Sequence, residues 1–81
     1  MIYKPTGVCS RQIDFDIEGN TLKNVKFTGG CNGNLQGIGR LVEGMDVDKV
    51  ISLLEGIQCG FKPTSCPDQL AKALKKAKEI Q

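Results

Sequence analysis

The feature that most constrains the fold is a change of hydrophobic period part-way along the chain. Apolar and polar side chains alternate over residues 11–17 and again, after a glycine-containing turn, over residues 21–28. Such alternation is typical of half-buried β-strands, so the two stretches predict a β-hairpin. We expect its apolar face to hold Ile13, Phe15, Ile17, Val25 and Phe27. Residues 2–9 are a candidate third strand around Ile2 and Val8.

The spacing of apolar residues becomes helical from Asn34 onward, which predicts three short helices. Gly44 is placed to end the first helix. The expected apolar face of that helix consists of Leu35, Ile38, Leu41 and Val42. Asp46 or Asp48 is placed to cap the second helix, and Gly56 to end it.

The third helix has the clearest start signal. Ser65 and Asp68 have the S-x-x-D spacing of a capping box, and Pro67 falls in the first turn, where its missing N–H is not needed. Its expected apolar face consists of Leu70, Leu74 and Ala77, flanked by Ala71 and Ala73. The sequence contains no repeat or linker. The order of the predicted elements, strands first and helices after them, therefore predicts one α+β domain over residues 1–81, in which an antiparallel hairpin packs against three C-terminal helices.

The net charge of +2 is confined to one end of the chain. Residues 1–66 carry seven basic and seven acidic side chains, so the excess comes from residues 67–81. The lysines of that segment are Lys72, Lys75, Lys76 and Lys78. Cations near the end of a helix complement its dipole and face water. Because the sequence has no arginine cluster and no interleaved aromatic residues, we do not expect a nucleic-acid partner.

Targeting and membrane signals are not evident in the sequence. Residues 1–5 contain no apolar h-region, and uninterrupted apolar runs are only a few residues long, too short to span a bilayer. We therefore expect a cytoplasmic protein with no membrane partner. In that compartment, cysteines are more often thiols or metal ligands than structural disulfides.

Histidine is absent from all 81 residues, which excludes Ser-His-Asp triads, Cys-His dyads and the HExxH zinc motif. Sulfur is then the distinctive chemistry, and the candidate metal ligands are Cys9, Cys31, Cys59 and Cys66. Each lies at the predicted end of an element, although the spacing lacks the paired cysteines of an ordinary zinc finger. If these ends converge, four thiolates could hold zinc. Redox use and simple packing of buried thiols are the alternatives.

Within the redox alternative, Cys59 and Cys66 form the candidate pair. Cys66 falls in the first turn of the third helix, where backbone N–H groups and the helix dipole stabilise a thiolate, although Asp68 adds opposing charge. Six residues separate it from Cys59, the natural resolving thiol across a proline-containing loop.

Six of the ten glycines lie between Gly29 and Gly44, where a loop runs into the first helix. The candidate phosphate- or nucleotide-binding residues of this loop are Gly29, Gly30, Gly33 and Asn34. The segment matches no established phosphate-loop pattern, so packing is the favoured interpretation. Gly37 and Gly39, inside the helix, would then permit close contact with the hairpin or with a second chain in a homodimer.

Several segments together resemble one known family. The strings that carry the resemblance are Thr64-Ser65-Cys66-Pro67-Asp68, Gly29-Gly30-Cys31-Asn32-Gly33-Asn34 with Gly37-Ile38, Leu54-Glu55-Gly56-Ile57 before Cys59-Gly60, and Asp68-Gln69-Leu70-Ala71. They span about residues 29–74, and the chain resembles the TSCPD-domain family. The resemblance marks Cys31, Cys59 and Cys66 as the family's motif cysteines.

This resemblance implies a small domain found at the C-terminal end of some adenosylcobalamin-dependent ribonucleotide reductases and also as short free-standing proteins. A complete reductase needs a large barrel with a thiyl cysteine and a radical generator, for which 81 residues leave no room. The implied function is a non-catalytic accessory or binding module associated with ribonucleotide reduction, with a reductase or another protein as partner. The alternatives are a small dithiol redox protein and a phosphate or nucleotide binder.

Overall fold

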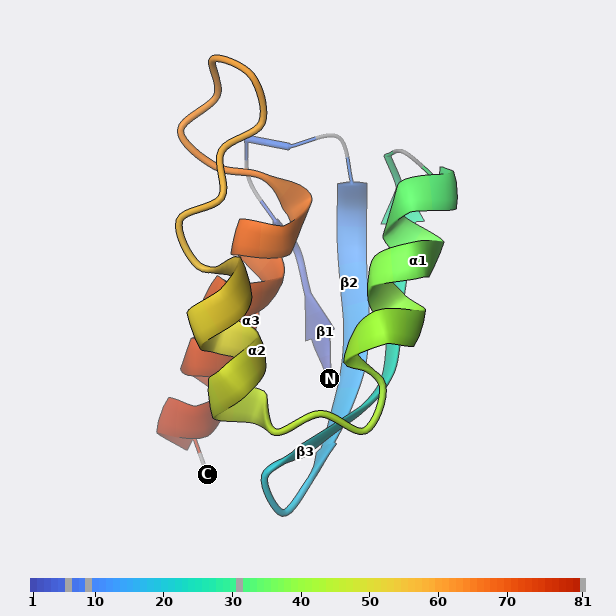
Figure 1. The fold of residues 1–81 in the computed structure, drawn as a ribbon, viewed down its shortest axis with the longest axis vertical. Helices are drawn as coiled ribbons and strands as arrows, with labels where there is room; N and C mark the ends of the chain where they lie inside the picture. The colour runs from blue at the N-terminus through green and yellow to red at the C-terminus, as the bar shows by residue number, and fades with distance from the viewer. Residues whose placement is uncertain (6, 9, 31, 81) are drawn as a thin grey trace.

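The computed structural model describes residues 1–5, 7–8, 10–30 and 32–80. Strands precede helices along the chain, which confirms the predicted α+β class (Figure 1). The elements are β1 (Ile2–Tyr3), β2 (Ser10–Glu18), β3 (Thr21–Gly29), α1 (Asn32–Val42), α2 (Val47–Leu54) and α3 (Cys66–Ile80).

The strands form one antiparallel sheet in the order β1-β2-β3. Gly19, with a φ of 63°, makes the turn between β2 and β3, so the hairpin lies where the sequence predicts it. A third strand is also present, but it is shorter than the predicted residues 2–9. It covers two residues beside the middle of β2, and Val8 lies outside it.

A register shift in the hairpin decides which residues of β3 face the core. Ile13 pairs with Phe27 and Ile17 pairs with Leu22, so β3 has one more residue than β2 between these pairs. Asn24 lies in this extra stretch with a φ of 57°, as at a β-bulge. Because opposed residues share a face, the bulge changes the inward positions from odd to even numbers. Leu22, which simple alternation leaves out, is therefore fully buried.

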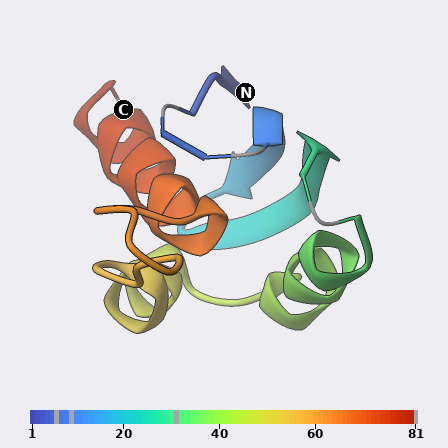
Figure 2. The same ribbon diagram turned by 90° about the horizontal axis from the view of Figure 1, so that it is seen from above.

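Helix α1 packs along β3 (Figure 2). Its buried face is narrower than predicted. Leu35 and Val42 are buried and Ile38 is half-buried, whereas Leu41 is 77% exposed. Consecutive helical residues differ by about 100° around the axis, so Leu41 turns away from β3 when Val42 faces it. The prediction that Leu41 belongs to the buried face is wrong.

Helices α2 and α3 pack against each other and lie apart from α1 in the view from above (Figure 2). Asp46, one of the two predicted caps, accepts a hydrogen bond from the N–H of Lys49 at 3.2 Å and begins α2. The predicted face of α3 is confirmed, because Leu70, Ala71, Ala73, Leu74 and Ala77 are all buried.

The hydrophobic core lies between the sheet and the helices. Its buried members are Ile13, Phe15, Leu22, Val42, Val47, Val50, Leu70, Ala73, Leu74 and Ala77. Among the helices that the structure describes, none has the length and apolar character needed to cross a membrane.

Candidate functional site

The pentapeptide at residues 64–68 contains the start of α3. The Ser65 hydroxyl accepts a hydrogen bond from the N–H of Asp68 at 3.2 Å, so Ser65 caps the helix as its spacing predicts. Pro67 is the second helical residue, where its missing N–H leaves no helical hydrogen bond unmade. Ser65 and Pro67 therefore fix the position at which α3 begins.

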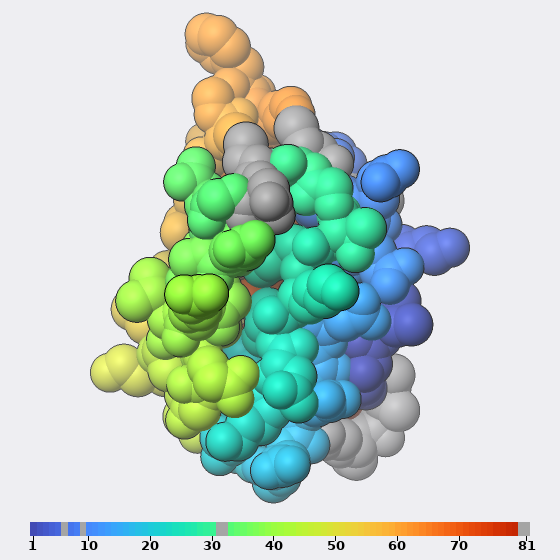
Figure 3. All heavy atoms as spheres, turned by 90° about the vertical axis from the view of Figure 1, so that its right-hand side faces the viewer, coloured from blue at the N-terminus to red at the C-terminus, as the bar shows by residue number. Residues whose placement is uncertain are grey.

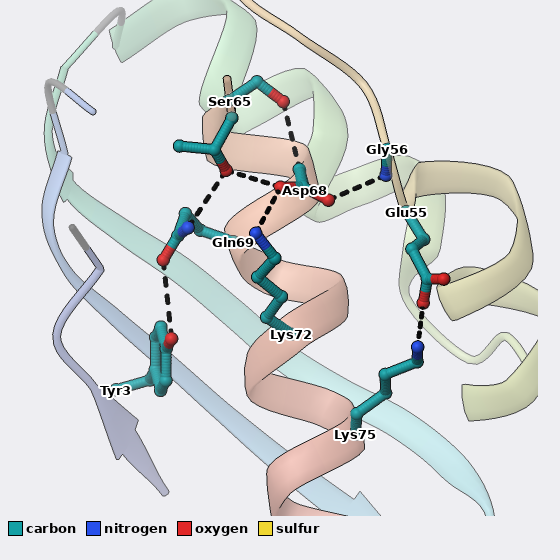
Figure 4. Close-up of polar contacts among 9 residues, drawn as sticks. Tyr3, Glu55, Gly56, Ser65, Asp68, Gln69, Lys72 and Lys75 are labelled. Carbon is teal, nitrogen blue, oxygen red and sulfur yellow. Dashed lines mark hydrogen bonds and ion pairs between the residues drawn. The ribbon is translucent and has the colours of Figure 1, made fainter. Parts of the chain in front are cut away.

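The Asp68 carboxylate joins α3 to the end of α2 (Figure 4). Asp68 is 2% exposed, and its Oδ1 accepts a hydrogen bond from the N–H of Gly56 at 2.7 Å. Its Oδ2 accepts from the Thr64 hydroxyl at 2.5 Å and forms an ion pair with Lys72 Nζ at 3.0 Å. The carboxylate thus binds groups from three parts of the chain. In an ordinary capping box, the same side chain would accept a hydrogen bond only from the backbone at the start of its own helix.

The surroundings of Asp68 act on its pKa in opposite directions. Burial raises the pKa, whereas the hydrogen bonds from Thr64 and Gly56 and the bond and charge of Lys72 lower it. The hydrogen bonds and the cation outweigh burial, and the pKa lies below its usual value. Asp68 is therefore ionised at neutral pH, and its charge stabilises the contact between α3 and the preceding segment.

Thr64 connects the same carboxylate to β1. Its hydroxyl donates to Asp68 and accepts from Gln69 Nε2 at 3.0 Å. The Tyr3 hydroxyl in turn donates to Gln69 Oε1 at 3.4 Å (Figure 4). The Thr64 carbonyl accepts from the N–H of Cys59 at 3.2 Å, which closes the base of the connection between α2 and α3. Thr64 therefore holds this connection to both the helix and the sheet.

Cys66 differs from the rest of the pentapeptide because it lines a groove. It is half-buried, and its Sγ lies 3.1 Å from the hydroxyl oxygen of Ser10 on β2. The groove has a volume of about 550 Å³ and also contains the exposed Cys59. Its lining residues are Gly33, Asn34, Leu35, Gly37, Ile38, Leu41, Ile57, Gln58, Cys59, Ser65, Cys66 and Pro67. The two predicted redox thiols thus lie on one surface between α1 and the start of α3.

The candidate anion loop is divided between two environments. Gly33 and Asn34 are exposed and line the groove. Gly29 and Gly30 have φ values of 83° and 74° and turn the chain out of β3. A Cβ at Gly30 would lie 3.0 Å from Leu35 Cδ1, so close packing and a left-handed backbone account for this glycine. Anion binding by the loop stays a prediction.

The predicted zinc site is only partly described. Cys9 and Cys31 lie outside the described residues, so their relation to Cys59 and Cys66 is not part of the structure. Within the described part of the chain, no three Cys, Asp or Glu side chains are grouped so that they could hold a metal ion. A four-cysteine zinc site therefore stays a prediction.

A second hollow lies between β3 and α1 (Figure 3). It has a volume of about 400 Å³, and its lining includes the charged residues Lys26, Arg40 and Glu43. No cysteine and no residue of the pentapeptide is among its lining residues. We therefore assign the candidate site to the thiol-containing groove.

Among the residues that the structure describes, three of the four C-terminal lysines form ion pairs. Lys72 pairs with Asp68, Lys75 with Glu55 and Lys78 with Asp48. Their charge is partly neutralised by carboxylates of the segment around α2 and of α3 itself, in keeping with a surface role for these lysines.

A family model, the TSCPD domain, matches residues 1–78. The chain belongs to the TSCPD-domain family. No curated protein and no solved structure matches it significantly. The match covers both described cysteines, the pentapeptide and the helix that forms the other wall of the groove.

The sequence did not predict the roles of several residues that line the groove or hold the start of α3. Ile57 and Leu41 are exposed apolar residues in the groove, and Gly56 anchors the Asp68 carboxylate. A helical wheel places Leu41 off the stripe formed by its neighbours, which would have identified it as exposed. For Gly56 no local signal exists, because its partner lies 12 residues away.

Proposed function

We propose that this TSCPD domain is a non-catalytic accessory module of ribonucleotide reduction that binds a protein partner through the groove. The observation that carries the proposal is the groove's composition: none of the twelve described residues that line it is charged. Leu41 and Ile57 remain 77% and 41% exposed there. Exposed apolar surface gathered in one concave place is typical of a protein-binding site. The link to reductases rests on the family resemblance given above.

The groove is better suited to binding than to acid–base catalysis. The chain contains no histidine, and no carboxylate or lysine is among the described residues that line the groove. General acid–base catalysis needs a titratable group within hydrogen-bond reach of the substrate. The thiols of Cys59 and Cys66 are the reactive groups that the lining residues provide.

Binding can be tested with the large chain of a ribonucleotide reductase from the same organism. We expect Leu41→Glu to weaken the dissociation constant by at least about tenfold, since it places a charge in a desolvated apolar contact. Isothermal titration calorimetry measures this change. The matched control is Leu53→Glu, because Leu53 is also exposed (56%) but lies on α2 outside the groove. Absence of binding, or equal effects of the two substitutions, would contradict the proposal.

A second candidate function is dithiol–disulfide exchange, which the shared position of Cys59 and Cys66 in the groove favours. The exposed Cys59 thiolate attacks a substrate disulfide, forms a mixed disulfide and releases one substrate thiolate. The Cys66 thiolate then attacks the Cys59 sulfur, releases the second substrate thiolate and closes a Cys59–Cys66 disulfide. Two electrons pass from the dithiol to the substrate disulfide, and the protons of the two cysteine thiols end on the two product thiols.

Single-turnover incubation with oxidised glutathione tests this second function. We expect the wild type to release two equivalents of glutathione and to yield a Cys59–Cys66 cross-linked peptide on mass mapping. Cys66→Ser should stop at the glutathione adduct on Cys59, because the resolving thiol is gone. Cys59→Ser, the matched control, should give no such adduct. A wild-type protein that accumulates no Cys59–Cys66 cross-link would rule out the redox function.

A further inference from the structure

The hollow between β3 and α1 is lined by two cations that the chain leaves unpaired. Lys26 of β3 and Arg40 of α1 both line it, and neither side chain forms an ion pair or a hydrogen bond within the part of the chain that the structure describes. Glu43, the one acid among the described lining residues, already has partners. Its Oε1 accepts a hydrogen bond from the N–H of Asn24 at 2.8 Å, and its Oε2 lies 3.9 Å from Lys23 Nζ. The charges of Lys26 and Arg40 are therefore available to an anion from outside the chain.

The backbone of β3 adds a donor and an acceptor to the same hollow. On β2, the N–H of Phe15 donates to the Met1 carbonyl at 2.9 Å, and the Phe15 carbonyl accepts from the Met1 nitrogen at 2.5 Å. The backbone groups of Phe15 thus point toward β1, and those of Ile13 point the same way because direction alternates along a strand. Ile13 is opposite Phe27, which lines the hollow. The two form a non-hydrogen-bonded pair, so the N–H and C=O of Phe27 point to the outer edge of β3.

Further along this edge, the chain itself occupies the backbone groups. The N–H of Leu22 donates to the Met45 carbonyl at 2.8 Å, and the Leu22 carbonyl accepts from the N–H of Gly44 at 2.8 Å. Phe27 has no corresponding partner among the described residues. Its N–H and C=O are therefore available to a group that presents an acceptor beside a donor.

The hollow has the size of a small-molecule site and is too short for an added strand. At one end, a Cβ on Gly39 would lie 2.9 Å from the carbonyl oxygen of Val25. At the other end, a Cβ on Gly30 would lie 3.0 Å from Leu35 Cδ1. These contacts lie on either side of Phe27 along β3, so α1 closes the space at both ends. The volume of about 400 Å³ falls within the range of about 300–1,000 Å³ that is typical of ligand pockets.

We propose that this hollow binds a small organic anion. Its phosphate or carboxylate contacts Arg40 and Lys26, and a planar group beside the anion, an amide or a nucleobase, bonds the N–H and C=O of Phe27. The arginine fork matches either oxyanion. Val25 and Leu35 supply apolar surface for the body of the ligand. This inference goes beyond the proposed function, since Leu35 is the one described lining residue that the hollow shares with the groove.

Amide NMR spectra of the isotope-labelled protein test the inference, with adenosine monophosphate and N-acetylaspartate as probes of the two chemical sources. We expect at least one probe to shift the Phe27 resonance saturably, with a dissociation constant of about 1 mM or lower. The probe that binds identifies the planar group as a nucleobase or an amide. Inorganic phosphate and acetate carry the charge without the planar group and should bind at least about tenfold more weakly.

Arg40→Gln should weaken binding of the same probe at least about tenfold, because it removes the charge and keeps a good helix former at an exposed position. The matched control is Arg11→Gln, since Arg11 is the other arginine of the chain and is exposed on β2 outside the hollow. It should bind the probe like the wild type. The spectrum of each variant also shows whether its fold is intact.

A Phe27 resonance that neither probe shifts at about 10 mM would overturn the inference. Equal binding of inorganic phosphate or acetate would also overturn it, because attraction to surface charge would then be the whole effect. Equal losses in Arg40→Gln and Arg11→Gln would place the anion elsewhere. Binding of an extended acidic peptide in place of both probes would assign the hollow to a protein partner and contradict the small ligand.

Discussion

We expect the substitution Asp68→Asn to lower the free energy of unfolding by about 3 kcal/mol relative to the wild type. Both oxygens of this buried carboxylate accept hydrogen bonds, one of them from a charged group. An amide keeps only one oxygen, so its NH2 group must face a group that is itself a hydrogen-bond donor. In Asp68 the donors are the Gly56 N–H, the Thr64 hydroxyl and Lys72. The expected loss is a large part of the roughly 5–15 kcal/mol that stabilises a typical domain. Urea unfolding followed by circular dichroism measures it.

The stability contributed by Asp68 should also depend on pH. Its folded-state pKa lies below the usual value, because hydrogen bonds and Lys72 outweigh the opposite effect of burial. A lowered folded pKa means that the unfolded chain binds the proton more readily. The contribution is therefore complete above the unfolded-state pKa of about 3.9 and is lost as the pH falls through the lower folded value. Asp68→Asn should flatten this part of the stability profile.

The matched control for both measurements is Asp48→Asn. The pKa of Asp48 is also lowered, chiefly by hydrogen bonds from Lys78 and Asn20, but its side chain is 60% exposed. Water screens such a pair, so the control should unfold nearly like the wild type. If Asp68→Asn behaved like this control, the buried carboxylate would not be what joins α2 to α3.

The parts of this fold that the sequence predicts are those set by near neighbours in the chain. Alternation over residues 11–17 predicts β2, and the spacing of Ser65 predicts the start of α3, because each signal operates within one strand or one helical turn. The anchor between Asp68 and Gly56 could not be predicted, since it forms only when α2 and α3 pack together. The bulge at Asn24 is hidden for a similar reason, because register depends on the partner strand.

The same limit applies to the candidate site. Cys59 and Cys66 could be paired as candidates from their spacing, but their common groove needs α1 as its opposite wall. Glycines in that helix gave an ambiguous signal, since a sequence cannot tell a glycine that permits contact from one that leaves space. The structure distinguishes Gly39, which faces β3, from Gly37, which faces open space.

These two glycines should therefore respond in opposite ways to alanine. Gly39→Ala places a Cβ 2.9 Å from the Val25 carbonyl oxygen, so α1 must move away from β3. Such overpacking costs about 1–3 kcal/mol, which is at least as large as the gain of about 1 kcal/mol in helix propensity. Backbone atoms, unlike the end of a flexible side chain, have little freedom to relieve the contact. Because the contact is with backbone, we expect a cost near the upper end, so that Gly39→Ala is destabilised by up to about 2 kcal/mol.

Gly37→Ala is the control within the same helix, since its Cβ would meet no described atom beyond the neighbouring turns of its own helix within 4 Å. It should gain up to about 1 kcal/mol from helix propensity alone. The two variants should then differ by up to about 3 kcal/mol, which corresponds to roughly 10 °C or more in melting temperature for a domain of this size. If both substitutions stabilised the protein equally, α1 would not approach β3 as closely as the structure shows. The shape of the groove would then also be in question, because α1 forms one of its walls.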